Sequence, residues 1–186
     1  SREEGTLIKQ GAMPADWKPA KRRQKDLDAT WTTKHGKSHF GYKLSVSVDR
    51  KYKFIRKFKT DTARVHDSQH FEAVVDDLNT SRDVYTDRGY PSKAREAWLK
   101  EHGYRNHIQR KGTRNKPLSE QQKKRNARIA KIRARVEHVF AAIEQMGGKR
   151  IRSIGQARAN FAMTMMAVCY NLKRLVYFQK SEIKAF

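Results

Sequence analysis

The chain has 186 residues, the length of about one domain, and 42 Lys and Arg against 19 Asp and Glu give it a net charge of +23. This excess indicates a polyphosphate partner. An aromatic content of 10% excludes a disordered basic tail, and a single cysteine, Cys169, excludes an intrachain disulfide and a cysteine-rich zinc site.

The first part of the chain divides into a polar lead-in and a predicted hairpin. Residues 1–38 are polar and basic with no sustained periodicity, so we expect them to be mostly irregular. Apolar and polar residues then alternate over 40–49, which predicts a strand. A second strand over about 53–59 is expected to pair with it across the turn at Arg50-Lys51.

Helices and strands alternate in the next segment. Apolar residues at helical spacing predict a helix over 71–78, and a short strand over 84–86 leads to Asp87. A second helix is expected from Pro91 to Gly103, followed by a strand over 104–110. This order predicts an α/β fold with a central sheet.

Two helices are predicted in the last third of the chain. The pattern Ser119-Glu-Gln-Gln122 is a capping box, and the helix that follows carries one apolar stripe until Gly147-Gly148. The last helix, over about 156–178, has one apolar face that we expect to be buried, together with Cys169 and the methionines around it. The residues of that face are Phe161, Met165, Val168, Leu172 and Leu175.

The positive charge is concentrated before and within the first of these helices. Between Lys100 and Arg135 there are thirteen Lys or Arg and two acids, Glu101 and Glu120, so this block carries about half of the net charge (13 − 2 = 11). A basic helix face is often only a solvated face. The imbalance here is too large for internal pairing, which favours contact with a nucleic-acid backbone.

Two acidic residues within this basic chain are candidates for a metal site. Asp87 follows a predicted strand, where α/β proteins place ligands, and Glu137 lies four residues after Arg133 on one helix face. The simple interpretation of Arg133 and Glu137 is a surface ion pair. The alternative is that Asp87 and Glu137 bind magnesium or manganese beside bound nucleic acid, as in a nuclease or polynucleotidyl transferase.

A set of short motifs occurs in a fixed order along the chain. The set includes Asp28-Ala-Thr-Trp31, Phe40-Gly-Tyr-Lys43, Val65-His-Asp-Ser-Gln69, Tyr85-Thr-Asp-Arg-Gly-Tyr90, Lys111-Gly-Thr-Arg-Asn-Lys-Pro-Leu118, Arg133-Ala-Arg-Val-Glu-His-Val-Phe140 and Tyr170-Asn-Leu-Lys-Arg174. Together they resemble the catalytic region of bacterial insertion-sequence DDE transposases of the IS-four/IS-five superfamily, over about residues 5–178.

The resemblance implies a ribonuclease-H-like α/β fold: a mixed central sheet flanked by helices, with a long basic C-terminal helical part. It also implies DNA transposition by a triad of two Asp and one Glu that binds two divalent ions, Mg²⁺ or Mn²⁺. Asp87 matches the second Asp, Glu137 the Glu, and Arg133 the Arg of the Arg-x-x-x-Glu signature. Ala130 stands where that signature has a Tyr.

The resemblance leaves the first Asp of the triad without a match. Asp28 matches a later family motif, and Asp49 is a weaker substitute. We therefore expect an amino-terminally truncated chain, with a lead-in over 1–38, a catalytic domain over 39–178 that lacks its first strand, and a tail over 179–186.

The expected partners are the DNA of the element ends and the target DNA, with no membrane, a possible homodimer on the DNA, and a cytoplasmic, nucleoid-associated location. A transposase-derived DNA-binding protein without activity and a basic RNA-binding protein are the alternatives. His66 and Gln69, with Asp67, are expected beside the site, although Asp67 could simply cap a helix. The other expected DNA contacts are Lys34, His35, Lys37, Arg110, Lys111, Arg114, Lys116, Arg128 and Arg135.

Overall fold

The computed structural model describes residues 2–10, 12–34 and 36–181, and its helices and strands form a mixed α/β structure. In this part of the chain the strands form two sheets. An antiparallel sheet has the order β1-β2-β3, and a parallel sheet pairs β4 with β5. The strands are β1 (Thr30–Lys34), β2 (Lys37–Val48), β3 (Ile55–Thr62), β4 (Asp83–Thr86) and β5 (Arg105–Ile108).

The strand β2 is the longest and changes partner along its length. Its first half pairs with β1 up to Gly41, and its second half, from Tyr42, pairs with β3. Gly41 has φ +140°, a conformation that side chains disfavour, so glycine permits the bend at this change of partner. The predicted hairpin of β2 with β3 is confirmed, although β2 begins earlier and β3 ends later than predicted.

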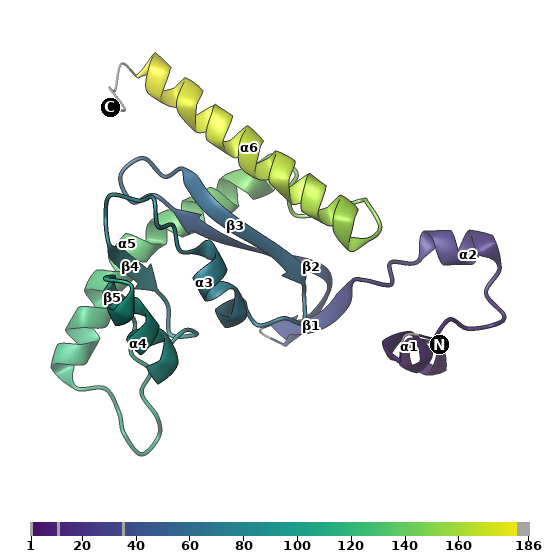
Figure 1. Cartoon of the computed structure of the whole chain (residues 1–186), viewed down its shortest axis with the longest axis horizontal. Helices are drawn as coiled ribbons and strands as arrows, with labels where there is room; N and C mark the ends of the chain where they lie inside the picture. The colour runs from purple at the N-terminus through teal and green to yellow at the C-terminus, as the bar shows by residue number, and fades with distance from the viewer. Residues whose placement is uncertain (1, 11, 35, 182–186) are drawn as a thin grey trace.

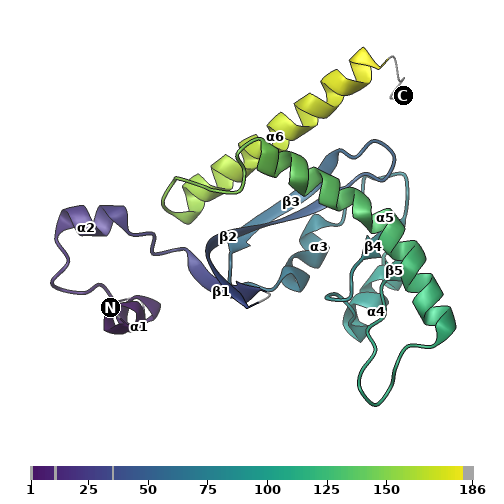
Figure 2. The same ribbon diagram turned by 180° about the vertical axis from the view of Figure 1, so that it is seen from behind.

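Two long helices, α5 (Glu120–Gln145) and α6 (Gln156–Lys180), cover one face of the antiparallel sheet (Figure 1). Figure 2 shows α5 in front and α6 running above β2 and β3, with α3 (Phe71–Val74) behind the strands. The core between the sheet and the two helices contains Ile55, Val139, Ile143, Ala167 and Tyr170. The predicted capping box at Ser119 is confirmed at the start of α5, and Gly147, with φ +86°, follows its end.

A second core lies around the parallel sheet. Phe71 of α3, Leu99 of α4 (Lys93–Glu101), Tyr104 and Ile108 are buried together, with Val84 of β4 packed against them. The single central sheet that we expected is therefore divided in two, because among the described strands β4 pairs only with β5 and β2 only with β1 and β3.

The lead-in is more regular than predicted. It contains α1 (Arg2–Lys9) and α2 (Pro19–Gln24), which begins with a proline at its first position. The Glu4 carboxylate accepts hydrogen bonds of 2.6 Å from both the Trp17 indole and the Lys21 ammonium, which ties the two helices together. Figure 1 shows both helices away from the main body of the chain.

The helix predicted over 71–78 is much shorter in the structure. A 3₁₀ turn, η1 (Asp67–His70), precedes α3, and Val75 is already extended. The Asp76 carboxylate instead accepts hydrogen bonds from Arg56 of β3 and from the Leu78 amide, which fixes a non-helical backbone. Leu78, the last apolar residue of that predicted helix, is 81% exposed.

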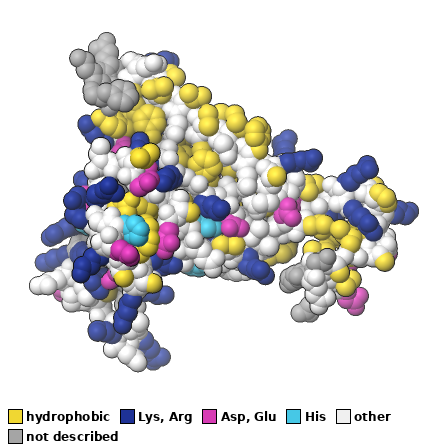
Figure 3. All heavy atoms as spheres, in the orientation of Figure 1, with side chains coloured by type: hydrophobic (Ala, Val, Ile, Leu, Met, Phe, Trp, Pro, Cys, Tyr) yellow, Lys and Arg dark blue, Asp and Glu magenta, His cyan; other side chains and the backbone are white. Residues whose placement is uncertain are grey.

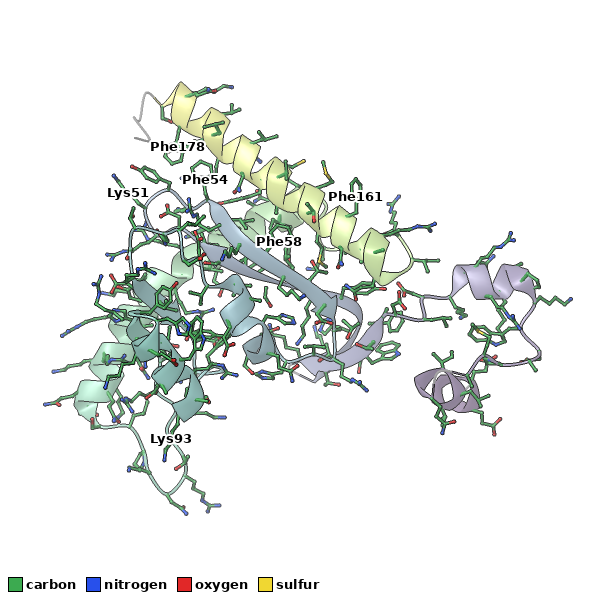
Figure 4. All side chains as sticks on the ribbon, viewed as in Figure 1. Lys51, Phe54, Phe58, Lys93, Phe161 and Phe178 are labelled. Carbon is green, nitrogen blue, oxygen red and sulfur yellow. The ribbon has the colours of Figure 1, made fainter. Side chains whose placement is uncertain are left out.

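The helix α6 is where predicted, but the face expected in the core is exposed. Phe161, Met165, Val168, Leu172 and Leu175 are all exposed, and so is Cys169. The buried face carries Ala159, Met163, Ala167, Tyr170 and Phe178. Figure 3 shows apolar side chains along the outer side of α6, and in Figure 4 Phe161 points away from the sheet while Phe178 lies beside Phe54. No helix in the described part of the chain is long and apolar enough to cross a membrane.

Candidate active site

Asp87 directly follows β4, and the backbone beyond it is tightly turned. One oxygen of its carboxylate, Oδ1, accepts a 2.7 Å hydrogen bond from the Gly89 amide. A Cβ at position 89 would lie 3.0 Å from the same oxygen, so glycine allows this close turn. The turn leaves the other oxygen, Oδ2, on the side of helix α5, 3.6 Å from the Arg133 guanidinium.

Glu137 lies one turn after Arg133 on α5, and the same guanidinium nitrogen, Nη2, is 3.5 Å from its carboxylate. Arg133 therefore lies between Asp87 and Glu137, and the three predicted catalytic residues come together. The Asp87 and Glu137 side chains remain 40% and 67% exposed, so solvent and ligands reach both carboxylates. The i, i+4 ion pair expected from the spacing is present, and Asp87 joins it from another element.

Asp87 and Glu137 border a large open groove of about 1090 Å³. Its walls are the second half of β2, the strand β4 and the inner side of α5. Apolar and polar side chains both line the groove, together with charged groups from several elements. The apolar lining includes Leu44, Val46, Val48, Val84, Val136 and Phe140.

The donor atoms of Asp87 and Glu137 suit a divalent cation. Carboxylate oxygens are the ligands that Mg²⁺ and Mn²⁺ prefer, and two carboxylates near each other in a chain of +23 mark an unusual site. In the described part of the chain, however, no group of three or more His, Cys, Asp or Glu could hold a metal ion. The two carboxylates fit part of a metal site, and a further ligand is needed to complete it.

Neither substitute for the first Asp joins this pair in an ion pair or hydrogen bond. Asp28 accepts a 2.8 Å hydrogen bond from the Gln156 amide, so it caps the first turn of α6. Asp49 borders the groove, but its carboxylate accepts a hydrogen bond from the Tyr52 amide within the β2–β3 turn.

Arg95 and Tyr90 support the site, and the sequence patterns did not identify either. The Arg95 guanidinium donates to the carbonyls of Tyr90 at 2.8 Å and Ser68 at 2.9 Å, which joins the turn after Asp87 to η1. Burial, followed by the charges of Asp67 and Asp87, raises the pKa of Tyr90 to about 12, so this phenol is neutral at physiological pH. The only sequence signal was position: Tyr90 ends the motif that contains Asp87, and Arg95 is a cation on a short helix.

The expected cluster at His66, Asp67 and Gln69 is only partly assembled at the groove. His66 and Asp67 line it, whereas Gln69 does not. His66, rather than Asp67, caps η1 by accepting from the Ser68 amide. The Asp67 carboxylate lies 3.4 Å from the Lys43 ammonium, which also donates to the Val65 carbonyl at 2.8 Å.

The basic block, Lys100–Arg135, runs from the end of α4 through β5 and an exposed loop into α5. Asn126, only 3% exposed, holds the start of this loop by exchanging 2.9 Å hydrogen bonds with the Arg110 backbone in both directions. Arg125 donates to the carbonyls of Ile108 and Asn106, so this cation has a structural role. The side chains left exposed to solvent include Arg110, Lys111, Arg114, Lys116 and Arg128. Figure 3 shows Lys and Arg gathered over this region.

The remaining expected DNA contacts lie on the β1–β2 hairpin and on α5. Lys34 and Lys37 are exposed and face each other at the tip of the β1–β2 hairpin. His35, between them in sequence, lies outside the described residues. Arg135 is exposed at the rim of the groove and donates to the Arg50 carbonyl in the β2–β3 turn at 3.0 Å.

A groove with paired carboxylates beside an exposed basic surface matches the family to which the chain belongs, the transposase DDE domain, whose model covers residues 9–172. Among curated proteins, the chain is similar to the transposase for insertion sequence element IS1106 of Neisseria meningitidis serogroup B, with 33% identity over 149 residues. This match covers 80% of the chain, and the chain spans about half (51%) of that relative's length. No solved structure matches the chain significantly.

Proposed function

We propose that this chain forms the larger part of the catalytic domain of an insertion-sequence transposase, a polynucleotidyl transferase that cuts DNA at element ends and joins it to target DNA. The observation that carries this proposal is the convergence of Asp87 and Glu137 on Arg133 at one groove. Membership of the transposase DDE family and the exposed basic side chains of the loop before α5 and of α5 support it.

Asp87 and Glu137 are the side chains of this chain that would hold divalent cations, which in such sites supply Lewis acidity to a phosphodiester. Arg133 has a positioning role: it keeps two like-charged carboxylates close together and is a donor for a phosphate oxygen at the same place. Lys43 orients Asp67, which also lines the groove.

A strand that fills the groove would complete the site. Among the described strands, Tyr42–Val48 pairs on one edge only, with β3, and β4 pairs on one edge only, with β5. Residues of both strands line the groove, together with Asp87 and Glu137. A strand bound to both edges would join the two sheets into the central sheet expected of the ribonuclease-H-like fold. It would also bring a carboxylate at its end near Asp87.

The exposed cations around the groove are suited to the DNA backbone. The loop with Arg110, Lys111, Arg114 and Lys116, the α5 residues Arg128 and Arg135, and the hairpin tip with Lys34 and Lys37 are the proposed phosphate contacts. His66 borders the active site, and Gln69 is proposed as an outer contact. Association with the nucleoid would follow from such binding, and a homodimer on the DNA would bring two element ends together.

Manganese binding tests the role of the two carboxylates. Calorimetric titration of the chain with Mn²⁺ is expected to show weak binding that falls at least about tenfold in both Asp87→Asn and Glu137→Gln. Glu144→Gln is the matched control, because Glu144 also lines the groove but pairs with Lys149. Equal binding by all four proteins would refute the metal-binding role.

Cleavage assays separate this function from its alternatives. Because the described residues hold only two of the three expected carboxylates, the chain is expected to bind duplex DNA and to nick supercoiled plasmid little or not at all with Mg²⁺. Robust nicking that disappears in Asp87→Asn would show that an acid within the chain completes the site. Binding of duplex DNA without binding of Mn²⁺ would favour a purely DNA-binding protein. Tighter binding of structured RNA than of duplex DNA would favour an RNA-binding protein.

A further inference from the structure

Two aromatic side chains lie side by side on the surface of the β1–β2 hairpin. Trp31 of β1 and Phe40 of β2 are cross-strand partners, with ring centroids 5.1 Å apart and ring planes inclined by 46°. Trp31 is 64% exposed and Phe40 49% exposed. Trp17, in contrast, is buried and Trp98 is half-buried, so Trp31 is the most exposed tryptophan of the chain.

The hairpin is a separate arm that borders the active-site groove. We call β1 together with Lys37–Gly41 the β-arm; it ends at Gly41, where β2 changes its partner from β1 to β3. Phe40 and Lys34 of the β-arm line the same groove as Asp87 and Glu137. A ligand that crosses from the groove onto the β-arm therefore passes over Phe40 and reaches Trp31.

The charge of the β-arm favours a polyanion. Lys34 and Lys37 are paired at its tip, and both are exposed. The sequence contains no Asp or Glu between Asp28 and Asp49, so no carboxylate of this segment offsets the two cations. Exposed rings next to uncompensated lysines are the combination by which proteins bind single-stranded nucleic acid, because the rings stack on bases and the cations contact phosphates.

We propose that Trp31 and Phe40 form a stacking site for an unpaired base of single-stranded DNA, with Lys34 and Lys37 on the adjoining phosphates. The proposal rests on the DNA-binding function argued above and adds to it a selectivity for unpaired DNA. In a duplex the faces of the bases are covered by their neighbours, so only an unpaired base presents a face to the Trp31 indole.

Fluorescence anisotropy with a labelled single-stranded oligonucleotide and a duplex of equal length tests the site. Trp31→Ala and Phe40→Ala are expected to weaken binding to the single strand about tenfold and binding to the duplex less than about twofold. Trp31→Phe, which keeps a ring, is expected to retain most of the affinity. Phe161→Ala is the matched control, because Phe161 is an equally exposed aromatic residue, at 67%, on the outer side of α6.

Two further measurements distinguish stacking from other roles. Single-stranded DNA is expected to quench the tryptophan emission of the wild type, and this quenching is lost in Trp31→Phe although binding persists. The dependence of affinity on salt is expected to be unchanged in Trp31→Ala and reduced in the double variant Lys34→Ala/Lys37→Ala. Unaltered thermal unfolding midpoints of the variants confirm that the exposed rings are not needed for folding.

The outcomes also separate this proposal from the proposed function. If the wild type binds DNA but Trp31→Ala binds the single strand as tightly as Phe161→Ala does, the stacking site is refuted and the DNA-binding function stands. An equal loss of single-strand and duplex binding in Trp31→Ala likewise refutes it. If the wild type binds neither form of DNA, both proposals fail together.

Discussion

Asp83 begins the strand that leads to Asp87, and its carboxylate holds that strand to its neighbour. The Arg105 guanidinium of β5 donates to both of its oxygens, at 2.7 and 2.9 Å, and the His107 imidazole lies 2.8 Å from one of them. The parallel sheet has only two strands of four residues each, so these side-chain bonds are a large share of its stabilisation. The position of Asp87 therefore depends on a residue four places earlier.

The interaction of Asp83 with Arg105 predicts that the folded protein is less stable in acid. The Arg105 guanidinium, with a smaller contribution from His107, holds the pKa of Asp83 well below its usual range. Stabilisation from a carboxylate with a lowered pKa is present above the pKa of the unfolded state, near 4, and is lost as the pH falls below it. Asp83→Asn is expected to lower the free energy of unfolding by about 2 kcal/mol at pH 7, and by progressively less below pH 4.

Urea unfolding of the wild type and Asp83→Asn between pH 3 and pH 7 measures this difference. Asp77→Asn is the matched control, because Asp77 pairs with Lys57 on the surface and its side chain is 70% exposed. A difference between the wild type and Asp83→Asn that stays constant with pH would contradict the prediction.

At the scale of the elements, α6 is apolar on two opposite faces and only one of them faces the sheet. Tyr170 donates to the Lys53 carbonyl at 2.9 Å, and the Asn171 side chain exchanges 2.9 Å hydrogen bonds with the backbone of Ile55 in both directions. Arg174 donates to the Tyr52 carbonyl at 3.0 Å. The motif Tyr170-Asn-Leu-Lys-Arg174 therefore fixes α6 to β3, and these polar bonds decide which apolar face is buried.

Enlarging two neighbouring residues of α6 tests this orientation. Ala167 is 3% exposed against the sheet, so Ala167→Leu is expected to overpack the core and to lower the free energy of unfolding by about 1–3 kcal/mol. Val168 is 43% exposed on the opposite face, so Val168→Leu is expected to change it by less than about 0.5 kcal/mol. Chemical denaturation compares the two, and equal effects would mean that α6 presents a different face to the sheet.

The sequence predicted those elements whose determinants are local. The capping box at Ser119 and the alternation along β2 depend on neighbouring residues, and the structure confirms both. The buried face of α6 was not predictable, because periodicity alone does not choose between two apolar faces and the choice depends on distant partners in β3. The early end of α3 likewise depends on the ion pair of Asp76 with Arg56.

The candidate site was predictable in its residues but not in its surroundings. Asp87, Arg133 and Glu137 follow from their motifs, and the structure brings them together. The support from Arg95 depends on backbone carbonyls that fold against its guanidinium, and such contacts leave no mark in a single sequence. The division of the strands into two sheets is also non-local, since it depends on which edges of β2 and β4 find a partner.

At the scale of the whole molecule, exposed cations are concentrated on the loop before α5 and on α5, the helix that carries Arg133 and Glu137. If the exposed cations of the loop before α5 contact DNA phosphates, each contact releases counterions, so affinity falls steeply with salt. A duplex of any sequence would show the same effect, because phosphate contacts carry no sequence information. The affinity for DNA then depends more on where the cations lie on the surface than on the net charge of +23.

Replacing three of these cations tests their role in binding. The triple variant Arg114→Gln/Lys116→Gln/Arg128→Gln is expected to reduce the slope of log affinity against log salt by about 3, roughly 1 for each phosphate that the variant no longer neutralises. The reduction is expected to be similar for unrelated duplexes, as measured by fluorescence anisotropy over a range of salt concentrations. The control Lys57→Gln/Lys149→Gln removes two cations that pair with Asp77 and Glu144, and it is expected to change the slope little. If the triple variant and this control reduce the slope equally per charge, DNA responds to the net charge of the protein and the loop before α5 is not a specific contact surface.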